Sequence, residues 1–105
     1  MESLISDVDL ATEQKFNRLK DEWRKDTLAT SSVTKMSMHP AYQRIIGMGP
    51  AVIPLLLREL QTDPDHWFWA LGVITEENPI SEEDAGDIIK MSKAWLSWGK
   101  RNGLI

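Results

Sequence analysis

Apolar side chains recur at helical spacing along most of this chain, and prolines, glycines and Ser/Thr-rich stretches separate the recurring segments. In the first such segment Phe16, Leu19 and Trp23 stand at positions i, i+3 and i+7, which predicts one apolar helix face. Thr12 is the expected N-cap of this helix. Residues 1–10 show no such period, and we expect them to be mobile. No segment gives a convincing strand pattern.

Proline and glycine mark the helix boundaries in the middle of the chain. Pro40 suits the first position of a helix, and Gly47 or Gly49 suits its end. Pro50 then opens a leucine-rich helix with one apolar arc, formed by Ile53, Leu56, Leu57 and Leu60. The Ser/Thr-rich residues 27–38 favour turns, so we expect an irregular connection there.

Two further helices are predicted in the last third of the chain. The first is expected to begin with Asp63 as N-cap and Pro64 as its first residue, and to end near Thr75. In the second, Ser81 and Asp84 resemble a capping box, and the helix runs to about residue 102. These segments predict an all-α fold, a compact stack of about five helices in a single domain over residues 1–105.

Residues 49–75, GPAVIPLLLRELQTDPDHWFWALGVIT, resemble one HEAT-like repeat. The shared pattern is Gly-Pro, an early second proline, a leucine-rich helix, a short loop with Asp, and a second helix with Ala-Leu-Gly. The resemblance implies an α-hairpin at the centre of the stack, with the flanking helices as caps, because a lone repeat cannot bury both of its faces. HPAYQRIIGMG, WFWAL and AWLSWG together resemble a family of small uncharacterised bacterial proteins, which implies no activity.

The stretch DPDHWFWALG places aromatic residues on opposite sides of a helix. One arc, which we expect to face the leucine-rich helix, contains Trp67, Ala70, Leu71 and Ile74. At 100° per residue, Trp69 and Val73 point elsewhere. A helix that is apolar all round is normally buried on two sides, and the last helix, with Trp95 and Trp98, offers a second wall. We therefore expect Trp69 to pack against the last helix; the alternative is a partly exposed Trp69 that anchors a partner.

Residues suited to catalysis or metal binding are sparse. The chain has no cysteine, which excludes thiolate zinc sites and cysteine nucleophiles. Its two histidines, His39 and His66, lie at expected helix starts, where capping or turn roles account for them. His66 with Asp63 and Asp65 lacks a further ligand at the spacing that zinc sites use. We predict no enzyme activity and no cofactor.

The sequence also predicts a cytoplasmic location without membrane association. No window approaches the roughly 18 apolar residues of a membrane span. No signal peptide is visible in the first twenty residues. The absence of cysteine is compatible with a reducing compartment.

Charge is divided unevenly along the second half of the chain. Between residues 59 and 87 there is no Lys or Arg, and the acidic residues, which we call the acidic sector, are Glu59, Asp63, Asp65, Glu76, Glu77, Glu82, Glu83, Asp84 and Asp87. Beyond Asp87 the charged residues are all basic: Lys90, Lys93, Lys100 and Arg101. Such asymmetry bears on the choice of partner rather than on the fold.

These patterns predict a non-catalytic protein-interaction module that binds a basic protein partner, as an adaptor or as an antitoxin- or immunity-type neutralising protein. The predicted partner-binding residues are Asp63, Asp65, His66, Trp69, Glu76 and Glu77. The alternative function is that of a nucleic-acid-associated regulator, because a basic helix face can contact phosphates. The residues for that role would be Lys90, Lys93, Lys100 and Arg101.

Overall fold

Helices joined by short turns and loops make up the fold, and none of the residues 2–105 forms a β-strand. The computed structural model describes the backbone of residues 2–105 and the side chains from Leu10 onward. Its elements are α1 (Glu2–Thr27), α2 (Val33–Met38), α3 (Pro40–Gly47), the 3-10 helix η1 (Gly49–Val52), α4 (Ile53–Thr62), α5 (Phe68–Thr75), the 3-10 helix η2 (Glu82–Asp84) and α6 (Ile88–Arg101). The predicted all-α class is confirmed.

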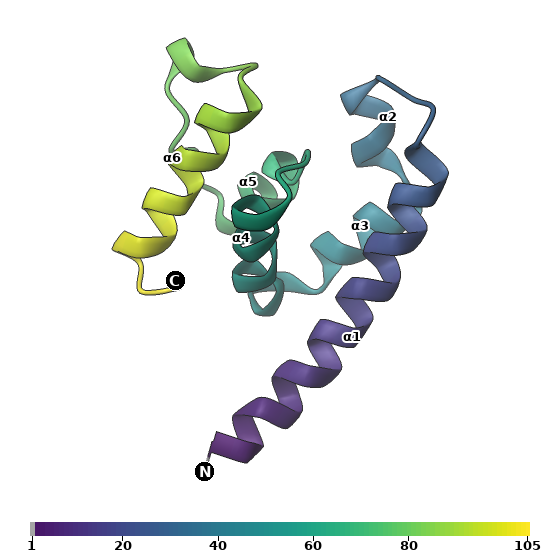
Figure 1. Cartoon of the computed structure of the whole chain (residues 1–105), viewed down its shortest axis with the longest axis vertical. Coiled ribbons are helices and arrows are strands. Elements are labelled where there is room, and N and C mark those ends of the chain that lie inside the picture. The colour runs from purple at the N-terminus through teal and green to yellow at the C-terminus, as the bar shows by residue number, and fades with distance from the viewer. Residues whose placement is uncertain (1) are drawn as a thin grey trace.

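Helix α1 forms one side of the molecule, and α3 turns back along it (Figure 1). The helix begins at Glu2, so the predicted N-cap at Thr12 is wrong: Thr12 lies inside a continuous helix. The sequence predicts that residues 1–10 are mobile. Apart from Leu10, the side chains of these residues lie outside the part that the structure describes. The expected irregular connection over 27–38 contains the short helix α2, whose N-cap Ser32 accepts a hydrogen bond from the backbone N–H of Lys35.

Pro40 and Gly47 bound α3 as predicted, whereas Pro50, the predicted start of the leucine-rich helix, lies in the 3-10 helix η1, and α4 begins at Ile53. Pro40 opens α3, and the N-cap is His39, whose Nδ1 accepts a hydrogen bond from the N–H of Ala41. Gly49 has a positive φ of 72°, a backbone conformation that favours glycine. The chain then makes the 3-10 turn η1 before α4 begins with Pro54 in its first turn, where a missing N–H breaks no helical hydrogen bond.

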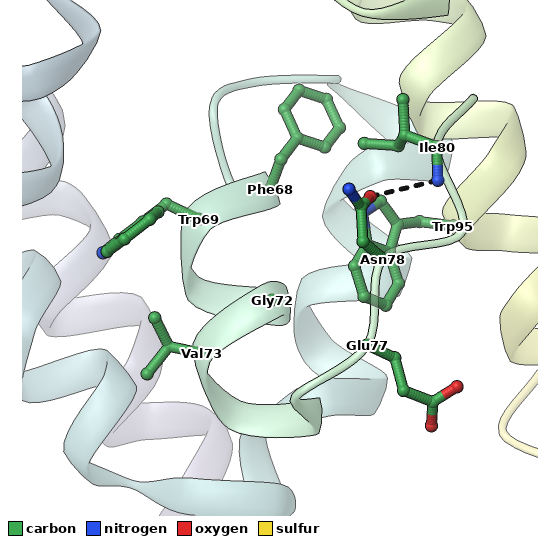
Figure 2. Close-up of a pocket in the computed structure, with 8 residues that line it drawn as sticks. All are labelled: Phe68, Trp69, Gly72, Val73, Glu77, Asn78, Ile80 and Trp95. Carbon is green, nitrogen blue, oxygen red and sulfur yellow. Dashed lines mark hydrogen bonds between the residues drawn. The ribbon is translucent and has the colours of Figure 1, made fainter. Parts of the chain in front are cut away.

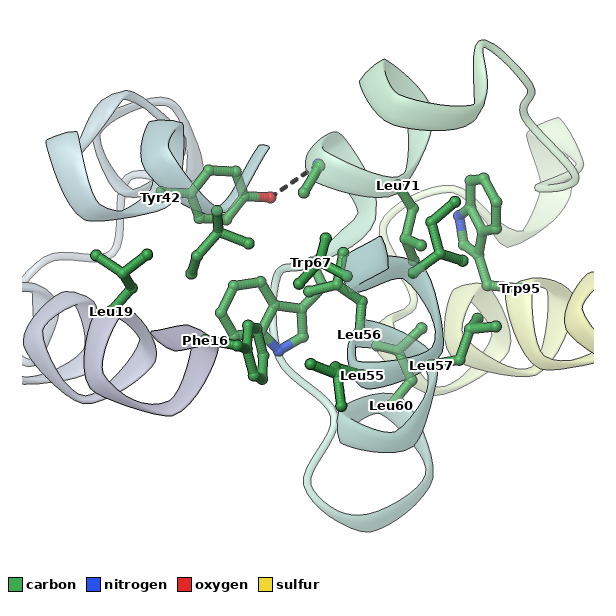
Figure 3. Close-up of a cluster of buried hydrophobic side chains, with 14 of the residues drawn as sticks. Phe16, Leu19, Tyr42, Leu55, Leu56, Leu57, Leu60, Trp67, Leu71 and Trp95 are labelled. Atoms are coloured by element: carbon green, nitrogen blue, oxygen red, sulfur yellow. Dashed lines mark hydrogen bonds between the residues drawn. The ribbon is translucent and has the colours of Figure 1, made fainter. Parts of the chain in front are cut away.

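The centre of the core is Trp67, which is fully buried (Figure 3). Its indole ring lies 5.7 Å from the ring of Phe16, 4.6 Å from that of Trp23 and 5.6 Å from that of Tyr42, measured between centroids. These neighbours come from α1 and α3, so Trp67 packs the N-terminal helices against the segment that leads into α5. Burying an aromatic ring of this size contributes on the order of 2–3 kcal/mol.

Helix α6 packs against α4, whereas α5 packs chiefly against α3. Trp95 and Trp98 of α6 are buried and meet edge to face, with centroids 5.2 Å apart. On the α4 side the Cβ position of Gly99 would lie only 2.8 Å from Leu57, so glycine permits this close approach. The apolar face of α6 therefore packs against α4. The expectation that the last helix covers the far side of α5 is wrong.

Two predicted helix starts are also wrong, and each has a tertiary or local cause. Residues 63–66 precede α5 as a loop, and the N–H of Ala70 in the first turn donates to the hydroxyl of Tyr42 instead of to an N-cap side chain. The predicted capping box at Ser81 gives only the short turn η2, without a side-chain cap. Asp87 caps α6 instead, accepting hydrogen bonds from the N–H groups of Ile89 and Lys90.

Candidate functional site

Trp69 projects from α5 away from the core and is 58% exposed. It follows Trp67 by two residues, about 200° around the helix, so that burying Trp67 against α1 and α3 turns Trp69 outward. Val73, one turn later on the same side, is also exposed. The expectation that Trp69 packs against the last helix is wrong. Trp69 is instead exposed, as the alternative of a partner-anchoring tryptophan requires.

An open, mainly apolar groove of about 460 Å³ runs between α5 and the chain that leads to α6. Helix α5 supplies Phe68, Trp69, Gly72 and Val73. Figure 2 shows Trp69 and Val73 on one side of α5, with Ile80 and Trp95 on the other. We call this feature the α5/α6 groove.

Gly72 lies between the two walls of the groove, with no side chain to fill it (Figure 2). Apart from the adjacent residues and the backbone of α5 itself, a Cβ atom added there would have one described neighbour within 4 Å, the backbone oxygen of Glu77 at 3.8 Å, which is an ordinary contact. The residue has no positive φ that would require glycine. A glycine inside a helix is less favourable than alanine by about 0.5–1 kcal/mol. Among the described residues, nothing inside the protein accounts for glycine at this position.

Carboxylates lie where α5 ends. Glu76 caps the C-terminus of α5 in the left-handed conformation, with a φ of 57°, and its side chain is exposed. Glu77 lines the groove, and its Oε1 accepts a hydrogen bond of 3.1 Å from Nε1 of Trp98. The carbonyl groups at a helix C-terminus carry partial negative charge as well. This end of the groove is therefore suited to a cation.

The first part of the acidic sector forms ion pairs with α1, which offset part of its negative charge. Oε2 of Glu59 lies 3.0 Å from Nζ of Lys20, and Oε1 of Glu59 lies 3.3 Å from the guanidinium of Arg24. The same guanidinium lies 3.4 Å from a carboxylate oxygen of Asp63 and 3.5 Å from one of Asp65. These residues are 35 to 41 positions apart in the chain, so no local sequence signal reveals the pairing.

The six predicted partner-binding residues therefore do not line one hollow. Trp69 and Glu77 line the α5/α6 groove, and Glu76 adjoins Glu77. Asp65 and His66 line a different hollow, of about 360 Å³, beside Trp23 and Arg24. The backbone oxygen of His66 accepts a hydrogen bond from Tyr42, which gives that loop a structural role.

The four basic residues near the C-terminus, Lys90, Lys93, Lys100 and Arg101, are all exposed on α6. None of them forms an ion pair with a described side chain. Their charge is thus available at the surface, as the nucleic-acid alternative requires.

The polar groups of His39 and Tyr42 have structural partners, whereas the buried Nε1 groups of Trp67 and Trp95 have none among the described residues. His39 uses Nδ1 for Ala41 and places Nε2 2.8 Å from Asp26. Burial raises the pKa of the Tyr42 hydroxyl far above its ordinary value; the hydrogen bond from Ala70 opposes this shift, and the charge of Asp65 adds to it. In the part of the chain with described side chains, no three His, Cys, Asp or Glu residues gather to hold a metal ion. None of the described helices has the length and apolar character to cross a membrane.

Comparison with known proteins gives no match to a family model, a curated protein or a solved structure. The HEAT-like resemblance and the resemblance to small bacterial proteins therefore stay predictions. Functional inference rests on the α5/α6 groove and the charges around it.

Proposed function

We propose that this protein is a non-catalytic interaction module that binds a basic protein partner through the α5/α6 groove. The observation that carries the proposal is the exposure of Trp69 at the edge of an apolar groove whose end bears Glu76 and Glu77. Tryptophan is enriched at the centres of protein interfaces, where its burial dominates the binding energy. A large exposed ring beside an apolar hollow is typical of an interaction site.

Charge supports a basic partner rather than an acidic one. In the acidic sector, Glu59, Asp63 and Asp65 form ion pairs with α1. The later part of the sector has no ion-pair partner among the described side chains. That part comprises Glu76, Glu77, Glu82, Glu83, Asp84 and Asp87. Carboxylates concentrated on one segment attract a basic surface and speed association at low salt.

A finer form of this proposal is an adaptor or a neutralising protein of the antitoxin or immunity type, acting in the cytoplasm. A protein that acts on nucleic acid presents a basic surface to phosphates, and such a surface would complement the later part of the acidic sector. The step from charge to biological role is an analogy. The partner's identity would decide between an adaptor and an inhibitor.

The test is affinity capture from cells that make this protein, followed by measurement with the purified, identified partner. We expect Trp69→Ala to weaken binding by about 30-fold, the effect of losing a 2 kcal/mol hot spot. Leu28→Ala is the matched control, because Leu28 is an apolar side chain 84% exposed outside the groove. A partner that binds Trp69→Ala and wild-type protein equally well would contradict the proposal.

A second candidate function is favoured by the exposed cations of α6, which form no ion pair with a described side chain. If they bind nucleic acid, affinity for random DNA or RNA falls steeply with salt, with a log–log slope of about −0.9 per duplex phosphate contacted. Changing Lys90, Lys93, Lys100 and Arg101 to Glu should then abolish binding. The absence of salt-dependent binding by the wild-type protein would exclude this function.

A further inference from the structure

Gly72 is the feature of the groove that the protein's own packing does not explain. Glycine lowers helix stability, and a Cβ atom would fit here without a clash. A position without a side chain allows another chain to come close to the backbone of α5. Gly72 lies between Trp69 on one wall and Ile80 on the other, so the closest approach falls in the middle of the groove (Figure 2).

The architecture restricts the conformation of a peptide in this groove. An extended strand would need a sheet edge to satisfy its backbone hydrogen bonds, and none of the residues 2–105 forms a strand. A helix satisfies its own backbone groups and presents an apolar ridge to a groove. Helix α5 has eight residues and rises about 12 Å, which matches roughly two turns of a helical ligand.

We propose, on the basis of the proposed function, that the groove binds an amphipathic helix of the partner protein. Its apolar ridge, with residues at i, i+3 or i+4, and i+7, packs across Gly72 between Trp69 and Ile80. A Lys or Arg at one end of that helix lies beside Glu76 and Glu77, where the C-terminal carbonyls of α5 add to the negative potential.

The test uses the full chain and displayed libraries of random 16-residue peptides as the probe. Selection on wild-type protein should enrich peptides with helical apolar spacing and a terminal Lys or Arg. Each should gain helical circular dichroism on binding and shift the indole N–H resonance of Trp69. Gly72→Leu, which fills the groove, should weaken these peptides at least tenfold, while Leu28→Ala should not change their affinity.

A second variant keeps the test decisive if Gly72→Leu fails to fold. Val73→Lys changes an exposed groove residue outside the core, and it should weaken the same peptides at least tenfold. Selection of no peptide, of proline-rich peptides that stay non-helical, or of peptides that both variants bind with wild-type affinity would overturn the inference. A natural partner that loses affinity with Trp69→Ala but not with Gly72→Leu would leave the proposed function standing and refute the helical occupant alone.

Discussion

The ring of Tyr42 lies almost parallel to the indole of Trp67, with an interplanar angle of 8° and centroids 5.6 Å apart. The hydroxyl of the same Tyr42 donates to the backbone oxygen of His66 and accepts from the N–H of Ala70. Tyr42 thus holds the residues before and after Trp67 as well as the ring itself. This arrangement fixes which side of α5 is buried, and it leaves Trp69 facing the groove.

The first prediction concerns the hydroxyl group of Tyr42. Tyr42→Phe keeps the ring stack but leaves the buried N–H of Ala70 without its acceptor, so we expect the free energy of unfolding to fall by about 1–3 kcal/mol. Urea denaturation measures the change. Unchanged stability would mean that Ala70 finds another acceptor.

The second prediction concerns alkaline pH. Burial raises the pKa of Tyr42 in the folded protein, so above the ordinary tyrosine value of about 10 the unfolded chain loses this proton while the folded chain keeps it. The folded state then binds more protons than the unfolded state, and stability falls as pH rises, by up to about 1.4 kcal/mol per pH unit. Tyr42 is the only tyrosine, so Tyr42→Phe should remove this component of the pH dependence.

The third prediction compares two glycines within helices. Gly72→Ala should raise the free energy of unfolding by about 0.5–1 kcal/mol, because the added methyl group meets no close neighbour. Gly99→Ala should give no such gain, because its Cβ would lie 2.8 Å from buried Leu57 and 3.2 Å from Ile105. Thermal denaturation of the two variants tests this. A destabilised Gly72→Ala would show an internal need for glycine and weaken the case for an external ligand.

The fourth prediction concerns the start of α6. Asp87→Ala removes the acceptor for the N–H groups of Ile89 and Lys90, and should lower stability by about 1 kcal/mol. Ser81→Ala is the matched control, since Ser81 makes no capping hydrogen bond and its loss should change stability by less than about 0.5 kcal/mol. Equal effects in chemical denaturation would refute the assignment of Asp87 as the cap.

The fifth prediction concerns Arg24. Its guanidinium contacts Glu59, Asp63 and Asp65, so Arg24→Ala should lower stability by about 1 kcal/mol at low salt and by less at 1 M salt. Reversing Asp63 and Asp65 to Lys should act in the same direction, whereas Glu76→Lys should not, because Glu76 has no ion pair among the described residues. Denaturation curves at two salt concentrations distinguish these cases.

Local sequence signals determined the helical class and several helix boundaries. Pro40 and Gly49 act within a turn of their own position, through a fixed φ or a permitted positive φ, so their effect can be recognised without tertiary contacts. The burial of Trp67 follows from helical periodicity in the same way. Two of the three failed caps show the limit: Asp87 had a local competitor in Ser81, and the first turn of α5 is capped by Tyr42, 28 residues earlier in the chain.

The candidate site depended on contacts that the sequence does not encode locally. The charge split and the surplus of tryptophan are visible in the sequence, and they predict Glu76, Glu77 and Trp69 as binding residues. Only the tertiary structure showed that Arg24 pairs with Asp63 and Asp65, and that α6 packs on α4 and leaves the side of α5 with Trp69 and Val73 open. Helical periodicity specifies which residues share a face, whereas packing between distant helices decides which neighbour covers that face.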